Sequence, residues 1–216
     1  MSTLRRHDLV WLDSRLDAGA FVASAEHAVF ARNWVKQNRP LVVTRQPESQ
    51  DTSQVALGFT LPPMRTRISL CVPGTAIIRT TRPLPLADTI AHAPAGWREG
   101  MHQLLRLCEE TCAVARVYGS LSSQIATAEN YLDAASDLDL LIECNENTQL
   151  HILLASLEAF SSQTPRIDGE ILIPAGWAVA WRELAAAIRT GTPHQVLAKS
   201  DRETRLIPVS QLFTSR

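Results

Sequence analysis

The sequence predicts a mixed α+β protein, with a small β-rich N-terminal domain and a C-terminal domain whose mixed sheet is flanked by helices. Short β-branched runs separated by prolines fill residues 40–82. After residue 96, apolar residues recur at helical spacing and alternate with short apolar runs. Between these regions, prolines and a glycine interrupt the pattern over residues 82–96. We therefore expect one domain over residues 1–85 and a second over residues 86–216.

The N-terminal half combines one helix with several short strands. Ala25–Gln37 carries apolar side chains at helical spacing, and Pro40 follows it as a stop signal. Strands are expected at His7–Leu12, Leu41–Thr44, Val55–Leu61, Arg67–Val72 and Ala76–Arg79.

The C-terminal half alternates helical and strand patterns. Helices are expected at Gly96–Ala113 and Thr148–Phe160, a helix or loop at Gln124–Tyr131, and a partly helical segment at Trp177–Ile188. Strands are expected at Ala115–Tyr118, Leu138–Ile142 and Arg166–Ile173, with Val196–Lys199 and Leu206–Pro208 returning to the sheet.

Composition excludes several classes of protein. The 216 residues carry a net charge of −1, which argues against broad nucleic-acid binding because that requires a basic surface. No apolar run reaches the length of a membrane span, and no secretory signal is evident. The four cysteines (Cys71, Cys108, Cys112 and Cys144) lack paired zinc spacing. We expect a cytoplasmic protein with free thiols that binds neither nucleic acid nor membrane.

Two aspartates mark the most informative strand. Asp137 and Asp139 stand two residues apart, so a β-strand projects both carboxylates to one side while Leu138 and Leu140 face the core. Adjacent carboxylates repel one another unless a cation lies between them, and oxygen ligands suit Mg2+. Alternatively, Asp137 caps a turn after Ser136 and Asp139 is a solvent-facing strand residue.

A glycine–serine pair follows the preceding strand. Gly119 permits close approach of a ligand to the backbone, and the amides after it can form an anion-binding nest. The Ser120 hydroxyl adds a further hydrogen-bonding group for a phosphate oxygen. We expect Gly119 and Ser120 to bind substrate phosphates.

The order of these features resembles the nucleotidyltransferase superfamily, in which an apolar strand, a Gly-Ser turn and an Asp-x-Asp strand follow one another. The resemblance implies a third acidic ligand on a later strand, for which Asp168 is our choice and Glu170 the alternative. The interval before Asp137 is longer than is usual in that superfamily. Its residues Ala126–Ala135 either contact substrate or form a plain loop.

A narrower resemblance covers most of the chain. Five sequence blocks resemble the phosphoribosyl-dephospho-CoA transferases of malonate decarboxylase, also called malonate decarboxylase holo-acyl-carrier-protein synthases. The blocks are Arg6–Trp11, Arg39–Val43, Tyr118–Ser122, Ser136–Leu141 and Trp181–Leu184. The resemblance implies that a serine of the malonate decarboxylase acyl carrier protein attacks triphosphoribosyl-dephospho-CoA, forming a phosphodiester and releasing pyrophosphate.

That reaction assigns roles to the acidic residues. Asp137 and Asp139 hold Mg2+, and Asp168 completes the ligand set or assists deprotonation of the incoming serine.

Positive charge is also needed for a highly anionic donor. Candidate cations are Arg116, Arg166, Arg182 and Lys199, among which Lys199 ends an apolar strand-like run and Arg182 lies in a family block. We expect Lys199 and Arg182 to bind substrate phosphate, although solvation at the surface is the alternative for each. A second basic set is suited to an acidic carrier protein, with the same alternative. Its members are Arg39, Arg45, Arg65 and Arg67.

Two other functions stay open. One is a different Mg2+-dependent nucleotidyltransferase that adenylylates a small molecule or a protein through the same metal site. The other is a non-catalytic binding module with the same fold.

Overall fold

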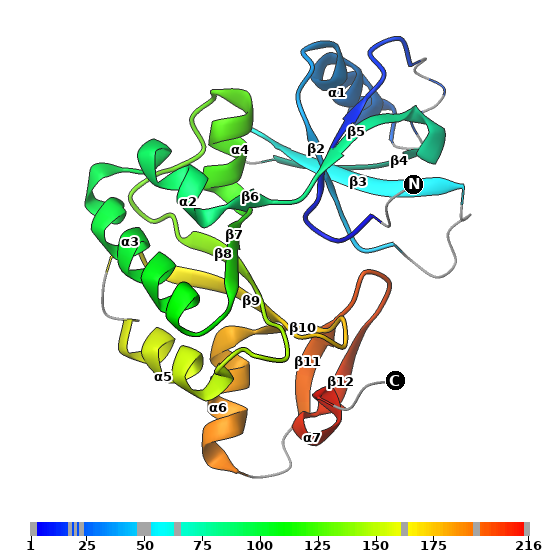
Figure 1. Cartoon of the computed structure of the whole chain (residues 1–216). Helices are drawn as coiled ribbons and strands as arrows, with labels where there is room; N and C mark the ends of the chain where they lie inside the picture. Colours follow the sequence, from blue (N-terminus) through cyan, green and yellow to red (C-terminus); the bar gives the residue numbers. More distant parts are fainter. Residues whose placement is uncertain are drawn as a thin grey trace. The chain divides into compact units, whose positions relative to one another are not determined.

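The computed structural model describes residues 4–16, 19, 21, 24–46, 53–62, 66–160, 164–191 and 195–213 (Figure 1). It confirms the predicted α+β class, with a five-stranded and a seven-stranded sheet within these ranges. The chain forms two compact units. Unit 1 comprises Met1–Pro83, Ala126–Tyr131 and Asp201–Glu203, and unit 2 comprises Leu84–Ile125, Leu132–Ser200 and Thr204–Arg216.

Unit 1 contains an antiparallel sheet and helix α1 (Ala25–Lys36), whose N-terminus is capped by the Ser24 side chain. The strand order is β4-β3-β2-β1-β5. The strands are β1 (Leu9–Leu12), β2 (Leu41–Val43), β3 (Gln54–Leu61), β4 (Thr66–Pro73) and β5 (Ile77–Thr81), and a short 3-10 helix, η2 (Gly74–Ala76), precedes β5.

The core of unit 1 forms where α1 packs on this sheet. Trp34 of α1 stacks on Phe59 of β3 with a centroid separation of 4.4 Å, and its indole Nε1 donates to Pro40 O at 2.8 Å. The hydrogen bond satisfies the buried indole N–H, as burial of tryptophan requires. Tyr131 also belongs to this core, and its hydroxyl donates to Thr60 O at 2.8 Å.

Unit 2 contains a mixed sheet in the order β12-β11-β10-β9-β8-β7-β6. The strands are β6 (Leu84–Pro85), β7 (Val114–Val117), β8 (Leu138–Glu143), β9 (Ile167–Leu172), β10 (Ala178–Ala180), β11 (Gln195–Lys199) and β12 (Thr204–Pro208). The helical segments are α2 (Leu86–Thr89), η3 (Ile90–His92), α3 (Ala95–Glu110), α4 (Gly119–Thr127), α5 (Leu150–Phe160), α6 (Trp181–Thr190) and α7 (Val209–Leu212). Strands β8 and β9 are parallel, and each other neighbouring pair in this sheet is antiparallel.

The two faces of β8 differ in chemistry. Leu138, Leu140 and Ile142 are nearly fully buried and share one apolar core with residues of α3, α5 and α6. Figure 1 shows these helices beside the sheet of unit 2. Because side chains alternate along a strand, Asp139 lies on the opposite face. The predicted inward orientation of Leu138 and Leu140 is confirmed.

Two local predictions differ from the structure. Helix α4 begins at Gly119 and ends at Thr127, so the Gly-Ser pair lies in its first turn, whereas we expected a helix or a loop only from Gln124. The segment predicted as partly helical from Trp177 divides into strand β10 and helix α6. The strand was missed because Ala178–Ala180 is too short to show a period of two.

Candidate active site

Asp139 and Asp168 occupy paired positions on the parallel strands β8 and β9. Neighbouring strands lie about 4.8 Å apart, and paired residues project to the same face. The two carboxylates therefore lie side by side on the face opposite α3, α5 and α6. Asp168 is exposed and Asp139 is partly exposed, so both reach solvent.

The start of helix α4 packs directly against Asp139. Gly119 has a φ of +65°, and a Cβ built there would overlap an oxygen of the Asp139 carboxylate. Glycine is thus required both by backbone conformation and by space. The Ser120 N–H donates to the Asp139 carboxylate, and the Tyr118 N–H donates to the Asp139 carbonyl at 3.1 Å. Gly119 and Ser120 therefore hold the aspartate, and their binding of phosphate remains a prediction.

Electrostatics at Asp139 disfavour its charged form. Burial and the neighbouring negative charges of Asp168 and Asp137 raise the pKa of Asp139 to about 6, although the Ser120 N–H opposes the shift. A divalent cation placed between these carboxylates would remove that repulsion. The chemistry of the donor set therefore fits Mg2+.

Asp137 lies just before β8, and an arginine holds its carboxylate. Arg166, the residue before β9, donates from Nε to Asp137 Oδ1 and from Nη2 to Asp137 Oδ2, the latter at 2.8 Å. The backbone joins the same region, since the Leu138 N–H donates to Arg166 O at 2.9 Å. Asp137 and Asp168 both raise the pKa of Arg166.

The structure separates the two candidates for the third carboxylate. Glu170 is buried and forms an ion pair with Lys199 at 2.7 Å, whereas Asp168 is exposed beside Asp139. Asp168 is therefore better placed to bind a metal ion. Lys199, predicted to bind phosphate, has a side chain that is 34% exposed, so this ion pair does not bury it completely.

The remaining candidate cations have different surroundings. Arg182 is exposed, donates to Ile167 O at 2.8 Å and lies over the Trp181 ring. Arg116 forms an ion pair with Glu143 at 3.0 Å. Arg182 is thus anchored to the first residue of β9, next to Asp168.

Three members of the basic set in unit 1 lie in the described residues: Arg39, Arg45 and Arg67. Arg39 forms an ion pair with Glu129 and lies over the Trp34 ring, so a structural role accounts for it. Arg65 lies outside the described residues. The fit of this set to an acidic carrier protein remains a prediction.

A second glycine, which the sequence reasoning did not single out, sets the geometry of the carboxylate pair. Gly169 has a φ of +146°, and a Cβ built there would overlap the carbonyl oxygen of Leu140 on β8. Its N–H donates to Asp168 Oδ1 at 2.8 Å. An Asp-Gly step inside the strand was the available signal, because a strand glycine often marks close backbone approach.

Among the described residues, no three His, Cys, Asp or Glu side chains form a ready-made metal site. In this structure Asp137 faces Arg166, which leaves Asp139 and Asp168 as the paired carboxylates. The buried thiols of Cys108 and Cys144 do not replace these carboxylates as metal ligands. Burial raises the pKa of Cys108 to about 12 and that of Cys144 to about 11, so neither supplies a thiolate at neutral pH.

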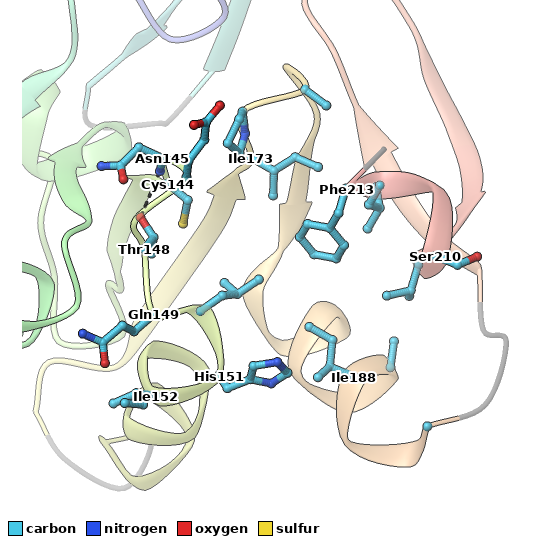
Figure 2. A pocket seen from close by; sticks show the side chains of 18 residues that line it. Cys144, Asn145, Thr148, Gln149, His151, Ile152, Ile173, Ile188, Ser210 and Phe213 are labelled. Carbon is cyan, nitrogen blue, oxygen red and sulfur yellow. Dashed lines mark hydrogen bonds between the residues drawn. The ribbon is translucent and has the colours of Figure 1, made fainter. Parts of the chain in front are cut away.

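A cavity of about 1580 Å3 lies in unit 2 (Figure 2). Cys144 and Ile173, which follow β8 and β9, line it together with Phe213 and Ile188. The aspartates lie at the opposite ends of the same two strands. None of the predicted site residues lines this cavity.

Each half of the chain matches a model of a known protein family. Family models match residues 5–83 as the phosphoribosyl-dephospho-CoA transferase MdcG N-terminal domain and residues 85–210 as the corresponding C-terminal domain. The chain belongs to the phosphoribosyl-dephospho-CoA transferase MdcG family. The predicted family resemblance is confirmed.

Relatives in this family match almost the full chain. A phosphoribosyl-dephospho-CoA transferase of Xanthomonas campestris pv. campestris (strain 8004) is 37% identical over 214 residues, covering 98% of this chain and 97% of that protein. One from Bradyrhizobium diazoefficiens is 32% identical, covering 97% and 92%. No solved structure matches the chain.

In the described part of the chain, no helix has both the length and the apolar character needed to cross a bilayer.

Proposed function

We propose that this protein transfers the phosphoribosyl-dephospho-CoA group from triphosphoribosyl-dephospho-CoA to a serine of the malonate decarboxylase acyl carrier protein. Family membership supports the donor group. The observation that carries the chemistry is the pairing of Asp139 with Asp168 beside the Gly119–Ser120 start of α4. Such a site suits transfer from a triphosphate, since that reaction needs positioning and charge neutralisation more than covalent help.

The proposed step is a substitution at phosphorus. The serine Oγ of the carrier protein forms a bond to the phosphorus nearest the ribose, and the bond from that phosphorus to the bridging oxygen breaks. Pyrophosphate leaves with the bonding electrons. The serine proton passes to a carboxylate of the site, for which exposed Asp168 is the candidate.

The residues of the chain have separate tasks in this proposal. Asp139, Asp168 and Asp137 hold Mg2+, which when bound neutralises charge on the triphosphate and the leaving group. Gly119 and Ser120 fix Asp139 and present the start of α4 to the pyrophosphate portion. Arg182 and Lys199 add positive charge for the donor phosphates.

The test is mass spectrometry of the carrier protein after incubation with donor, Mg2+ and enzyme. The wild type should add one phosphoribosyl-dephospho-CoA group per acceptor serine and release one pyrophosphate. Asp139→Asn and Asp168→Asn should each lose at least about 100-fold in rate. Glu110→Gln, at an exposed position on α3, is the matched control and should retain full activity.

Two further arms separate the alternatives. Pyrophosphate release from ATP, without transfer from triphosphoribosyl-dephospho-CoA, would support a different nucleotidyltransferase. Absence of turnover with both donors would support a binding module.

A further inference from the structure

We propose that Arg166 exchanges partners during the reaction cycle: it neutralises Asp137 in the metal-free enzyme and moves to the donor's phosphates when Mg2+ takes Asp137. This inference rests on the proposed function and adds a residue that links metal binding to substrate binding.

The first observation is the geometry of the pair. Arg166 contacts both oxygens of Asp137 through Nε and Nη2, the two-point arrangement that guanidinium groups form with carboxylates and phosphates. Both residues directly precede paired strands, since Leu138 and Ile167 are register partners. The backbone thus places the guanidinium beside the Asp137 carboxylate.

The second observation is exposure. The Arg166 side chain is 65% exposed, whereas that of Asp137 is 26% exposed. The guanidinium side of the pair is thus open to solvent, so Arg166 can turn to another partner while displacing little packing. The arginine can therefore leave Asp137 when a stronger competitor arrives.

The third observation is charge. Arg166 experiences the field of Asp168 as well as that of Asp137. In the metal-free state, its positive charge offsets part of the repulsion among the three aspartates. Mg2+ carries twice that charge and requires carboxylate oxygens that Arg166 now contacts. The two cations therefore compete for Asp137.

A triphosphate resolves this competition. Its oxygens carry more negative charge than one carboxylate and accept the same two-point contact. With Mg2+ on Asp137, Arg166 is released next to the place where the phosphates lie. The exchange makes the free site less attractive to Mg2+ alone and more attractive to Mg2+ bound with the triphosphate.

The test measures binding, not turnover, in wild type, Arg166→Gln and Arg166→Lys. Calorimetry with Mg2+ alone should show about 3- to 10-fold tighter binding in Arg166→Gln, because the competing cation is gone. Calorimetry with inorganic tripolyphosphate in saturating Mg2+ should show at least about 10-fold weaker binding in the same variant. Arg166→Lys should lie between wild type and Arg166→Gln in both titrations, since lysine keeps the charge without the two-point contact.

Arg189→Gln is the matched control. Arg189 forms an ion pair with Glu158 at 2.8 Å and is 64% exposed, yet lies on α6 away from the aspartates. It should bind both ligands as the wild type does.

Opposite shifts in the two affinities support the exchange. If Arg166→Gln binds Mg2+ no tighter than the wild type, or binds tripolyphosphate equally well, the exchange is wrong. These outcomes stay separate from the proposed function, because wild-type transfer to the carrier protein can succeed while the exchange fails. A wild type that binds neither Mg2+ alone nor tripolyphosphate in saturating Mg2+ would overturn both.

Discussion

Gly119 and Asp139 fit together so closely that a Cβ at the glycine would force the Asp139 carboxylate to move. The carboxylate of Asp139 fills the space that a Cβ of residue 119 would occupy. The first turn of α4 therefore packs against the Asp139 carboxylate and restricts its position.

Gly119→Ala should abolish transfer by displacing Asp139. Gly191→Ala is the matched control: Gly191 has a similar φ of +62°, but a Cβ there meets nothing within 4 Å. The control should lose about 1 kcal/mol of unfolding free energy from its backbone conformation alone and remain active. Gly119→Ala should lose more stability and bind Mg2+ at least about 10-fold more weakly. Equal effects of the two substitutions in urea unfolding and Mg2+ titration would contradict the packing explanation.

Asp139→Asn should stabilise the metal-free protein at neutral pH. The pKa of Asp139 is raised from 3.8 to about 6 in the folded state, so the folded protein holds this proton more tightly than the unfolded chain does. Protonation of Asp139 therefore stabilises the folded protein. This stabilisation is fully present below about pH 4 and is lost as pH rises through 6. The shift of two pKa units corresponds to about 3 kcal/mol, which partial solvent access reduces to about 2 kcal/mol.

Urea unfolding at pH 7.5 and pH 4 measures this effect. The asparagine variant should be more stable than wild type at pH 7.5, and the difference should disappear near pH 4. Added Mg2+ should stabilise the wild type and leave the variant nearly unchanged. A difference that does not vary with pH would rule out Asp139 as its source.

Lys199→Met should destabilise unit 2, because it removes the ion-pair partner of Glu170, whose side chain is only 7% exposed. The expected loss is about 3 kcal/mol in unfolding free energy. The double variant Glu170→Gln/Lys199→Met should recover most of it. If Lys199 also binds phosphate, the stable double variant should still bind Mg2+–tripolyphosphate about 5-fold more weakly. Undiminished binding would leave Lys199 with a structural role alone.

Tyr131→Phe should cost unit 1 about 1 kcal/mol, since the hydroxyl that donates to Thr60 O is removed. Tyr131→Ala should cost about 3–5 kcal/mol through the cavity that it leaves in the core. Thermal unfolding and hydrogen exchange of β3 amides measure both effects. Asn130→Ala, at an exposed position of the same segment, should change neither.

The sequence predicted those parts of the site that depend on local periodicity. The apolar run Leu138–Ile142, with one acidic residue inside it, gives the strand, and the period of two places Asp139 on the face opposite Leu138 and Leu140. Asp168 was preferred over Glu170 from its position after Ile167, and the parallel register pairs it with Asp139. Each inference needed only the order of residues within one strand.

The parts that the sequence did not predict depend on contacts between distant segments. The contacts of Arg166 with Asp137 and of Lys199 with Glu170 each join residues 29 positions apart. Their pairing follows from strand register, which a single sequence does not specify. The same limit applies to Ala126–Ala135, where either substrate contact or a plain loop was expected. Residues 126–131 of that segment instead belong to unit 1.

Unit 1 is completed by residues encoded far downstream of its first 83 positions. Tyr131 supplies part of its core, and Asp201 accepts the Arg6 N–H through its side chain and the Gln46 N–H through its backbone carbonyl. A gene truncated after codon 83 would specify this unit without those residues. During synthesis the ribosome must translate about two hundred codons before every residue of unit 1 is present. Recombination that exchanges only the first half of the gene would therefore combine a new unit 1 with Tyr131 and Asp201 from the original gene.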